Sequence, residues 1–381
     1  MLTADVTIPR GENAGRIWFP HFLRGCAALL VAVAHLSEVY PRAPTVAAAL
    51  GHFSPRANPI DVPWSAVAEA EVASRVSFGW IAVAIFFVVS GFVIPFSLRR
   101  ASIRGFTVRR FFRIYPTLWA CLAITLLVLV VQRFLSGSSV PYTAPEILKN
   151  AALIAPYTDD VWIEPVAWTL AIEELFYLTA ALMASRKVLA DARWILAVGA
   201  ACCALAFVPS TRDGTPFIFW LTYNLTFLPL IYVGAVIHEV WEQRWSRNKG
   251  IAVAAALILL YAIGLYAGPT SPEATLSLRS SLIGIAIFVA IATNSSRIKY
   301  SRALDLLGSI SYPLYLLHGV NGYVLLRWLE AHGISYYIGL PVAIAGALAG
   351  AVLVHYFVEL PMMRLGRRLG ATKRRPTVPV P

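Results

Sequence analysis

The stretch "FGWIAVAIFFVVSGFVIPFS", residues 78–97, contains twenty residues and no charged side chain. A helix of about 20 apolar residues is long enough to cross the ~30 Å hydrocarbon core of a bilayer. The whole chain of 381 residues is 58% hydrophobic and only 14% charged, and its mean hydropathy is +0.68. A water-soluble domain cannot bury so much apolar surface, so the sequence predicts a protein that lies in the bilayer.

Apolar segments of similar length recur along the chain, separated by turn-forming residues such as those in "PSTRDGTP". We count ten, of which the fifth and the eighth are short. The fold class that they predict is all-α, a polytopic bundle of about ten transmembrane helices. The ten segments are residues 22–40, 78–97, 117–135, 166–184, 194–208, 217–237, 251–268, 280–293, 309–328 and 337–357.

The basic residues indicate how this bundle is oriented. With the N-terminus in the cytoplasm, the cytoplasmic side holds 24 of the 32 Lys and Arg residues. Cytoplasmic loops are enriched in basic residues, so we expect both termini to be cytoplasmic. The same asymmetry explains the net charge of +12 without a nucleic-acid partner. We expect a multi-pass protein of the inner (plasma) membrane.

The chain divides into three parts. Residues 1–21 are a polar N-terminal segment, and residues 22–361 are the transmembrane domain. Residues 362–381 are a basic tail, which its composition predicts to be disordered. The longest connection on the outer side, residues 41–77, is either a cap over an outward-facing cavity or a plain surface loop.

The stretch "LRGCAALLVAVAH" (residues 23–35) of the first predicted span contains one arginine and one histidine. Arg24 and His35 are eleven positions apart, which is about three helical turns, so they share one helix face at a separation of about 16 Å. This layout suits a long anionic donor that enters from the cytoplasm with its reactive end at the membrane centre. The alternatives are an interfacial Arg24 that reaches the headgroups and a structural His35 that bonds a neighbouring helix.

A second motif is "FTVRRFFRIYP", residues 106–116. Arg110 and Arg113 are three positions apart and are therefore neighbours on a helix surface. Two guanidinium groups with aromatic residues between them form a good phosphate clamp. The alternative is that they only mark a cytoplasmic loop, since any such loop is basic.

A third motif is "WTLAIEELFYL", residues 168–178. Glu173 and Glu174 lie in an apolar segment, where carboxylates are costly and usually have a function. Glu173 is about 8 Å deeper in the membrane than Trp168. Trp168 and Tyr177 are candidates for stacking against a sugar, or else they anchor the helix at the interface.

A fourth motif is "GSISYPLYLLH", residues 308–318. Pro313 interrupts the helical hydrogen bonds and leaves a carbonyl group free to face a cavity. Tyr315 and His318 are three positions apart on one face, near mid-depth, and either line a substrate site or pack between helices. We find no metal-ligand spacing and no phosphate-binding Gly-rich loop in the sequence, so we expect no metal cofactor.

Together these stretches resemble the acyltransferase-3 family of membrane O-acyltransferases. The resemblance covers essentially the whole chain, from Leu23 to about Pro361, and identifies residues 22–361 as an acyltransferase-3 domain in its stand-alone form. Six motifs in the same order carry it, which makes the match specific. They are "LRGCAALLVAVAH", "FFVVSGFVI" (86–94), "RRFFRIYP" (109–116), "WTLAIEELFYL", "SYPLYLLH" (311–318) and "VELP" (358–361).

The resemblance implies transfer of an acyl group, usually acetyl from acetyl-CoA, to a carbohydrate hydroxyl. The acceptors that it implies are cell-surface glycans such as exopolysaccharides, lipid-linked sugars, and glycosides. CoA is a cytoplasmic polyanion, so Arg24, Arg110 and Arg113 are expected to bind it from the inner face. Ser90 is expected to donate a hydrogen bond to the thioester carbonyl.

On the acceptor side, His35 is expected to be the general base, because an unperturbed imidazole titrates near neutral pH. A covalent acyl-histidine is the less favoured variant. Glu173 is expected to bind sugar hydroxyls or to orient His35 or the acceptor. Trp168, Tyr177, Tyr315 and His318 complete the predicted acceptor site.

Two other classes of protein fit the same sequence. Ten spans with a central histidine and a Pro-interrupted helix are also typical of a transporter or flippase for a lipid-linked sugar. A non-catalytic scaffold of a polysaccharide assembly complex is a third interpretation. Transfer from labelled acetyl-CoA separates them, because only an acyltransferase carries it out.

Overall fold

We describe the protein from a computed structural model, which covers residues 18–135, 137, 141–210 and 214–371. These residues form helices and connecting loops, and no β-strand occurs among them. The helices are α1 (Trp18–Ala34), η1 (His35–Val39), α2 (Tyr40–Arg42), α3 (Pro44–Gly51), α4 (Ser65–Ser74), α5 (Phe78–Arg99), α6 (Ile103–Leu135), α7 (Ala144–Ala151), η2 (Ala155–Thr158), η3 (Pro165–Ala167), α8 (Trp168–Ser185), α9 (Ala192–Leu205), α10 (Pro216–Thr226), α11 (Leu228–Trp241), α12 (Arg247–Ala267), η4 (Ser271–Glu273), α13 (Ala274–Thr293), η5 (Ser295–Arg297), α14 (Arg302–Ser309), α15 (Ser311–Leu317), α16 (Val320–Ala331), α17 (Tyr336–Val354), η6 (His355–Glu359) and α18 (Leu360–Leu369).

Within the described residues, eight helical stretches are long and apolar enough to cross a membrane. They correspond to eight of the ten predicted segments, and they confirm an all-α polytopic membrane fold. The stretches are Trp18–Arg42, Phe78–Arg99, Ile103–Phe134, Pro165–Ser185, Pro216–Trp241, Arg247–Ala267, Ala274–Thr293 and Tyr336–Leu369.

The other two predicted segments are not simple spans. Segment 194–208 corresponds to α9, which is apolar but only 14 residues long. Segment 309–328 is interrupted, because α14, α15 and α16 follow one another with breaks at Ile310 and after Leu317. Pro313 has no amide hydrogen to donate to the carbonyl group four residues earlier, which is the physical reason for the first break.

The basic tail also differs from the prediction. Helix α18 continues to Leu369, so residues 362–369 are helical rather than disordered. Residues 372–381 lie outside the described residues. At the other basic stretch, α6 begins at Ile103, so Arg110 and Arg113 lie on a helix that continues directly into the third span.

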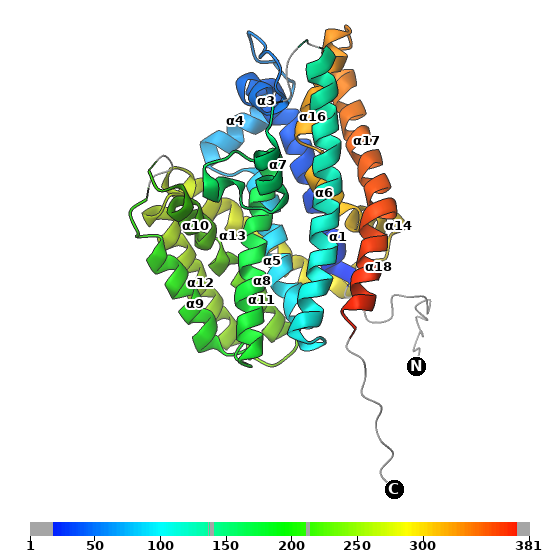
Figure 1. Ribbon diagram of the computed structural model, residues 1–381. Helices are drawn as coiled ribbons and strands as arrows, with labels where there is room; N and C mark the ends of the chain where they lie inside the picture. The colour runs from blue at the N-terminus through cyan, green and yellow to red at the C-terminus, as the bar shows by residue number, and fades with distance from the viewer. Residues whose placement is uncertain (1–17, 136, 138–140, 211–213, 372–381) are drawn as a thin grey trace, which may run out of the picture.

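Helix α5 is central to the bundle and packs against α1, α8, α11 and α13 (Figure 1). Its contact with α11 brings backbone against backbone. A Cβ atom added at Gly91 would lie 1.9 Å from the carbonyl oxygen of Ile231, and one added at Gly234 would lie 2.2 Å from that of Val88. Small residues at helix–helix contacts permit this approach within a membrane.

Helix α1 packs against α5, α14 and α15, and α8 packs against α5, α10 and α11. Helix α6 stands beside the continuous α17–η6–α18 stretch, and α1 and α16 lie close by (Figure 1). The start of α1 and the end of α18 lie at the same end of the bundle (Figure 1). Two turns in this region, η1 and η6, are π-helical, a rare geometry that is often found at functional sites.

Candidate active site

Two histidines from distant parts of the sequence face each other in the interior. His35 is the first residue of η1, and His318 directly follows α15. The Nδ1 atom of His35 lies 2.9 Å from the Nε2 atom of His318. His318 is fully buried and His35 is partly exposed. The pair therefore presents one accessible imidazole that is supported by a second, buried one.

The surroundings of His318 determine where the protons of the neutral pair lie. The Nδ1 atom of His318 is 3.2 Å from the carbonyl oxygen of Leu314, which can only accept a hydrogen bond. Nδ1 of His318 therefore carries the proton, and its Nε2 accepts from the Nδ1–H group of His35. This arrangement leaves Nε2 of His35 with a free lone pair, which is the group that a general base requires.

Glu173 is buried on α8 and accepts two hydrogen bonds. Ser90 Oγ donates to its Oε1 at 2.5 Å, and Tyr177 Oη donates to its Oε2 at 2.7 Å. Bonds to a charged acceptor are stronger than those between neutral groups, so they hold the carboxylate in place. Within the described part of the chain, the hydrogen bonds of Glu173 go to Ser90 and Tyr177 and not to His35.

The three arginines predicted to bind the donor converge. Arg24 and Arg110 both lie close enough to Arg113 to repel its charge. Arg110 also stands over the ring of Tyr177, 5.5 Å from its centre, and donates a hydrogen bond to Ser97. Tyr177 therefore contacts Arg110 through its ring and Glu173 through its hydroxyl group.

These arginines differ in their partners from two other half-buried arginines. Arg56 forms an ion pair with Glu330, and Arg99 forms one with Glu239. Among the described residues, no carboxylate lies within 4.0 Å of the guanidinium group of Arg24, Arg110 or Arg113. Three neighbouring cations with no carboxylate at ion-pair distance can bind a polyanion.

A small cavity joins this arginine cluster to Glu173. Its volume is about 20 Å³, and Arg24, Glu173, Thr169 and Tyr315 line it. A space of this size holds about one water molecule. The buried Nε–H group of Arg24 has no hydrogen-bond partner among the described residues, so it is available to a bound molecule.

The structure places two of the predicted acceptor residues, Tyr315 and Trp168, in different surroundings. Tyr315 lies next to the histidine pair, with its ring centre 6.0 Å from that of His318, and its hydroxyl accepts from Thr169. Trp168 instead packs in an aromatic cluster, 5.4 Å from Phe227 and 5.5 Å from Trp80. Trp168 therefore packs among other aromatic side chains, and its role in sugar binding stays a prediction.

A histidine–acid pair on η6 was not predicted from the sequence. His355 Nδ1 lies 2.7 Å from Glu359 Oε2, and Glu359 is buried. Glu359 is also close enough to Arg113 to attract its charge. The i,i+4 spacing of the two residues was the signal in the sequence, and Glu359 belongs to the "VELP" motif.

A polar network on the far side of His318 was missed as well. Thr125 donates a hydrogen bond to the buried Glu164, and Asn321 donates from Nδ2 to Thr125 at 2.7 Å and to the Leu317 carbonyl at 3.2 Å. The three polar residues come from separate parts of the chain, so no sequence pattern unites them. Asn321 Oδ1 has no partner among the described residues.

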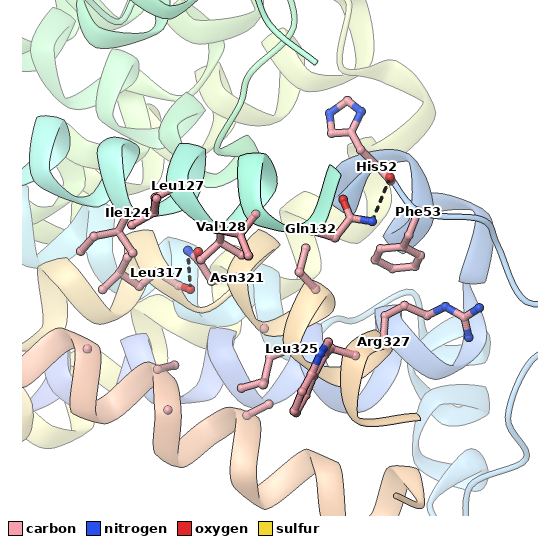
Figure 2. Close-up of a pocket in the computed structure, with 18 of the residues that line it drawn as sticks. His52, Phe53, Ile124, Leu127, Val128, Gln132, Leu317, Asn321, Leu325 and Arg327 are labelled. Carbon is pink, nitrogen blue, oxygen red and sulfur yellow. Dashed lines mark hydrogen bonds between the residues drawn. The ribbon is translucent and has the colours of Figure 1, made fainter. Parts of the chain in front are cut away.

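Asn321 also lines a large groove between α6, α16 and α17, with a volume of about 1100 Å³. Figure 2 shows Leu127, Val128 and Leu325 along its walls and the amide of Asn321 near one end. His52 and Arg327 lie at the opposite end (Figure 2). Burial and the nearby Arg133 lower the pKa of His52, which keeps its imidazole neutral near pH 7.

Metal-ligating side chains do not cluster in the described structure. No group of three or more His, Cys, Asp or Glu residues there could hold a metal ion. The groups that could bind a cofactor are the three arginines, whose chemistry suits phosphate.

Comparisons with known proteins show the family to which the chain is related. A family model described as "Acyltransferase domain" matches residues 17–358. A curated relative, "Acyltransferase MdmB" of Streptomyces mycarofaciens, is 30% identical over 345 residues, which is 80% of this chain and 85% of the relative. No solved structure matches the chain. The matched family region includes all of the site residues predicted from the sequence.

Proposed function

The chain belongs to the acyltransferase-3 family of membrane acyltransferases, and on this basis we propose that it transfers acetyl from acetyl-CoA to a hydroxyl group of a carbohydrate or glycoside. The reaction forms an ester C–O bond and breaks the thioester C–S bond. The acceptor hydroxyl loses its proton, and the departing CoA thiolate gains one. We place the enzyme in the inner (plasma) membrane, as its basic asymmetry indicates.

The observation that supports this mechanism best is the 2.9 Å hydrogen bond between His35 and His318. It orients the ring of His35 so that its free Nε2 accepts the proton of the acceptor hydroxyl as the oxygen attacks the thioester. His318 then accepts a hydrogen bond from an imidazolium rather than from a neutral ring, which strengthens that bond as charge develops. His35 returns the proton to the thiolate, so the base is regenerated.

The donor site in this proposal is the cluster of Arg24, Arg110 and Arg113. Their unpaired guanidinium groups suit the phosphates of CoA, and Arg24 lies eleven residues below His35 on the same helix. That spacing is about 16 Å, so a phosphate-anchored pantetheine arm can extend towards the histidine pair. Ser90 and Tyr177 hold Glu173 in place. Glu173 and Arg24 line the same small cavity, so Glu173 lies beside this path.

The proposal is tested with the purified protein, acetyl-CoA labelled in the acetyl group, and a panel of glycosides and lipid-linked sugars. We expect the label to appear in the acceptor as an ester and free CoA to appear in equal amount. A flippase would move the sugar lipid across a vesicle membrane unchanged, and a scaffold would do neither. Labelled acetyl-CoA that is bound but never discharged to any hydroxyl would contradict the proposal.

A further inference from the structure

The groove between α6, α16 and α17 passes close to the chain segment that carries His318. Leu317 and Asn321, which line the groove, are the residues one position before and three positions after His318. One end of the groove therefore lies next to the residue that is hydrogen-bonded to the candidate base. Its volume of about 1100 Å³ is at the upper limit of ordinary small-molecule sites, which occupy ~300–1,000 Å³. It can hold a molecule much larger than an acetyl group.

The walls of the groove are apolar and continuous with the lipid-facing surface. Leu127 and Val131 on α6 line it while 63% and 49% exposed, and Gly346 on α17 is also exposed. These helices are candidate membrane spans, so the exposed walls face lipid. A glycan chain laid along such walls would leave its hydroxyl groups without partners, which is costly, so the part of a glycoside that fills the groove has to be its apolar part. The walls instead suit an apolar body that arrives through the bilayer.

The polar groups of the groove lie at its two ends. At the inner end, Asn321 has a buried Oδ1 atom that lacks a hydrogen-bond partner within the described structure, and that atom would accept from a hydroxyl that enters beside it. At the outer end, Arg133 on α6 and Arg327 on α16 add positive charge. By helix rise, Arg327 is about 9 Å from Asn321 along α16. The order along the groove is thus a hydroxyl acceptor, an apolar wall and a cationic rim.

We propose that the groove is the acceptor site and that the acceptor is a hydroxylated amphiphile with an anionic far end. Its hydroxyl lies against Asn321 beside His35 and His318, its apolar body fills the groove, and its anionic end stays at Arg327 and Arg133. This inference rests on the acyl transfer proposed above. It narrows the acceptor from carbohydrates and glycosides in general to lipophilic hydroxyl compounds, apolar glycosides included, that enter from the half of the bilayer opposite the CoA-binding arginines.

The test uses probes that carry these three features in this order. 12-Hydroxydodecanoate has a hydroxyl, an apolar chain and a carboxylate, whereas 4-hydroxybutanoate lacks the chain and 1-dodecanol lacks the charge. With acetyl-CoA as donor, we expect KM to fall with each methylene that is removed from water, by about fourfold, and the variants below separate burial in the groove from partition into lipid or detergent. Equal KM values for the long and the short hydroxy acid would overturn the inference, even if acyl transfer to both is observed.

Two variants test whether the difference in KM arises in the groove. Gly346→Phe fills the groove, because a Cβ atom there would meet only the side chain of Leu325, at 3.5 Å. We expect it to raise KM for 12-hydroxydodecanoate at least about tenfold. Arg327→Gln is expected to raise KM for 12-hydroxydodecanoate but not for 1-dodecanol. Ala345→Phe is the matched control, because Ala345 is exposed on α17 and is not part of the groove lining.

The groove has a rival occupant, the acyl chain of the donor. If Gly346→Phe changed the preference between acetyl-CoA and decanoyl-CoA but left the acceptor KM unchanged, the inference would be wrong. Binding of labelled 12-hydroxydodecanoate, measured by scintillation proximity, keeps the test independent of turnover. If no acceptor is acylated, the proposed function fails. Weaker binding in Gly346→Phe would then still support the groove, and unchanged binding would overturn it.

Discussion

The Nδ1–H group of His35 donates a 2.9 Å hydrogen bond to Nε2 of His318, whose own Nδ1–H group faces the Leu314 carbonyl. A backbone carbonyl thus fixes the tautomer of one imidazole, and that imidazole fixes the tautomer of the other. The consequence is a lone pair at Nε2 of His35. His318 is buried and acts through His35, which makes it a positioning residue rather than a catalytic one.

Replacing His318 by Ala should lower kcat without changing the KM for acetyl-CoA. The Nδ1–H group of His35 then loses its partner, which costs about 1–3 kcal/mol, or about 5-fold to 150-fold. His318→Asn offers a carbonyl oxygen to the same N–H group and should recover part of the loss. Steady-state kinetics of the purified variants measure both effects. Equal kcat in wild type and His318→Ala would remove His318 from the mechanism.

Arg110→Ala and Arg113→Ala should each weaken the binding of acetyl-CoA. Losing one charge-assisted phosphate contact costs about 1.5–3 kcal/mol, which is about tenfold or more in affinity. Lys at either position should rescue only in part, because it cannot form a two-pronged contact. Titration calorimetry with acetyl-CoA gives the dissociation constants.

Arg109→Ala is the control for these variants, because the Arg109 side chain lies against Gly105 and Gly370. It should bind acetyl-CoA like the wild type. If the Arg110/Arg113 double variant also bound normally, the two arginines would be markers of topology alone.

Gly91→Ala should destabilise the protein although Ala is the better helix former. The added methyl group would overlap the carbonyl oxygen of Ile231 on α11, and overpacking of this kind costs about 1–3 kcal/mol. The thermal unfolding midpoint in detergent should fall. Gly79→Ala lies on the same helix, and its added Cβ meets only Ser77 Oγ, at 3.6 Å, so its midpoint should not fall. Equal midpoints for both variants would mean that α5 and α11 are not in backbone contact.

The predicted orientation has its own test. A reporter fused after Pro381 should be active only in the cytoplasm, because 24 of the 32 basic residues lie on the predicted cytoplasmic side. The start of α1 and the end of α18 lie at one end of the bundle, so both are expected on the same side of the membrane (Figure 1). Activity of this fusion in the periplasm would reverse the orientation.

Periodic and local features could be predicted from the sequence. The apolar runs gave the fold class and eight of the spans, because burial in lipid requires about 20 apolar residues wherever it occurs. Helix geometry also placed Arg24 and His35 on one face and Arg110 beside Arg113. The breaks around α15 were only partly predicted. Pro313 marked the first, but the chain after Leu317 carries no comparable signal.

Contacts between helices could not be predicted in this way. The sequence places His35 and His318 at a similar depth, but only the packing of α15 against α1 brings them to 2.9 Å. The groove beside them depends on the exposed faces of α6 and α17, which look like ordinary lipid-facing surfaces in the sequence. Ser90 is a further example, because its hydrogen bond to Glu173 joins residues 83 positions apart.

The measurement that tests the role of His35 most directly is single-turnover transfer by His35→Gln at saturating acetyl-CoA. Gln is similar in size to His but has no basic nitrogen, and donor binding by the same preparation shows that the fold is intact. Loss of a general base typically costs about 10²–10⁴ in rate, and we expect a loss in that range with normal acetyl-CoA affinity. A near-normal rate of transfer by His35→Gln would contradict the account and would make His35 a structural residue.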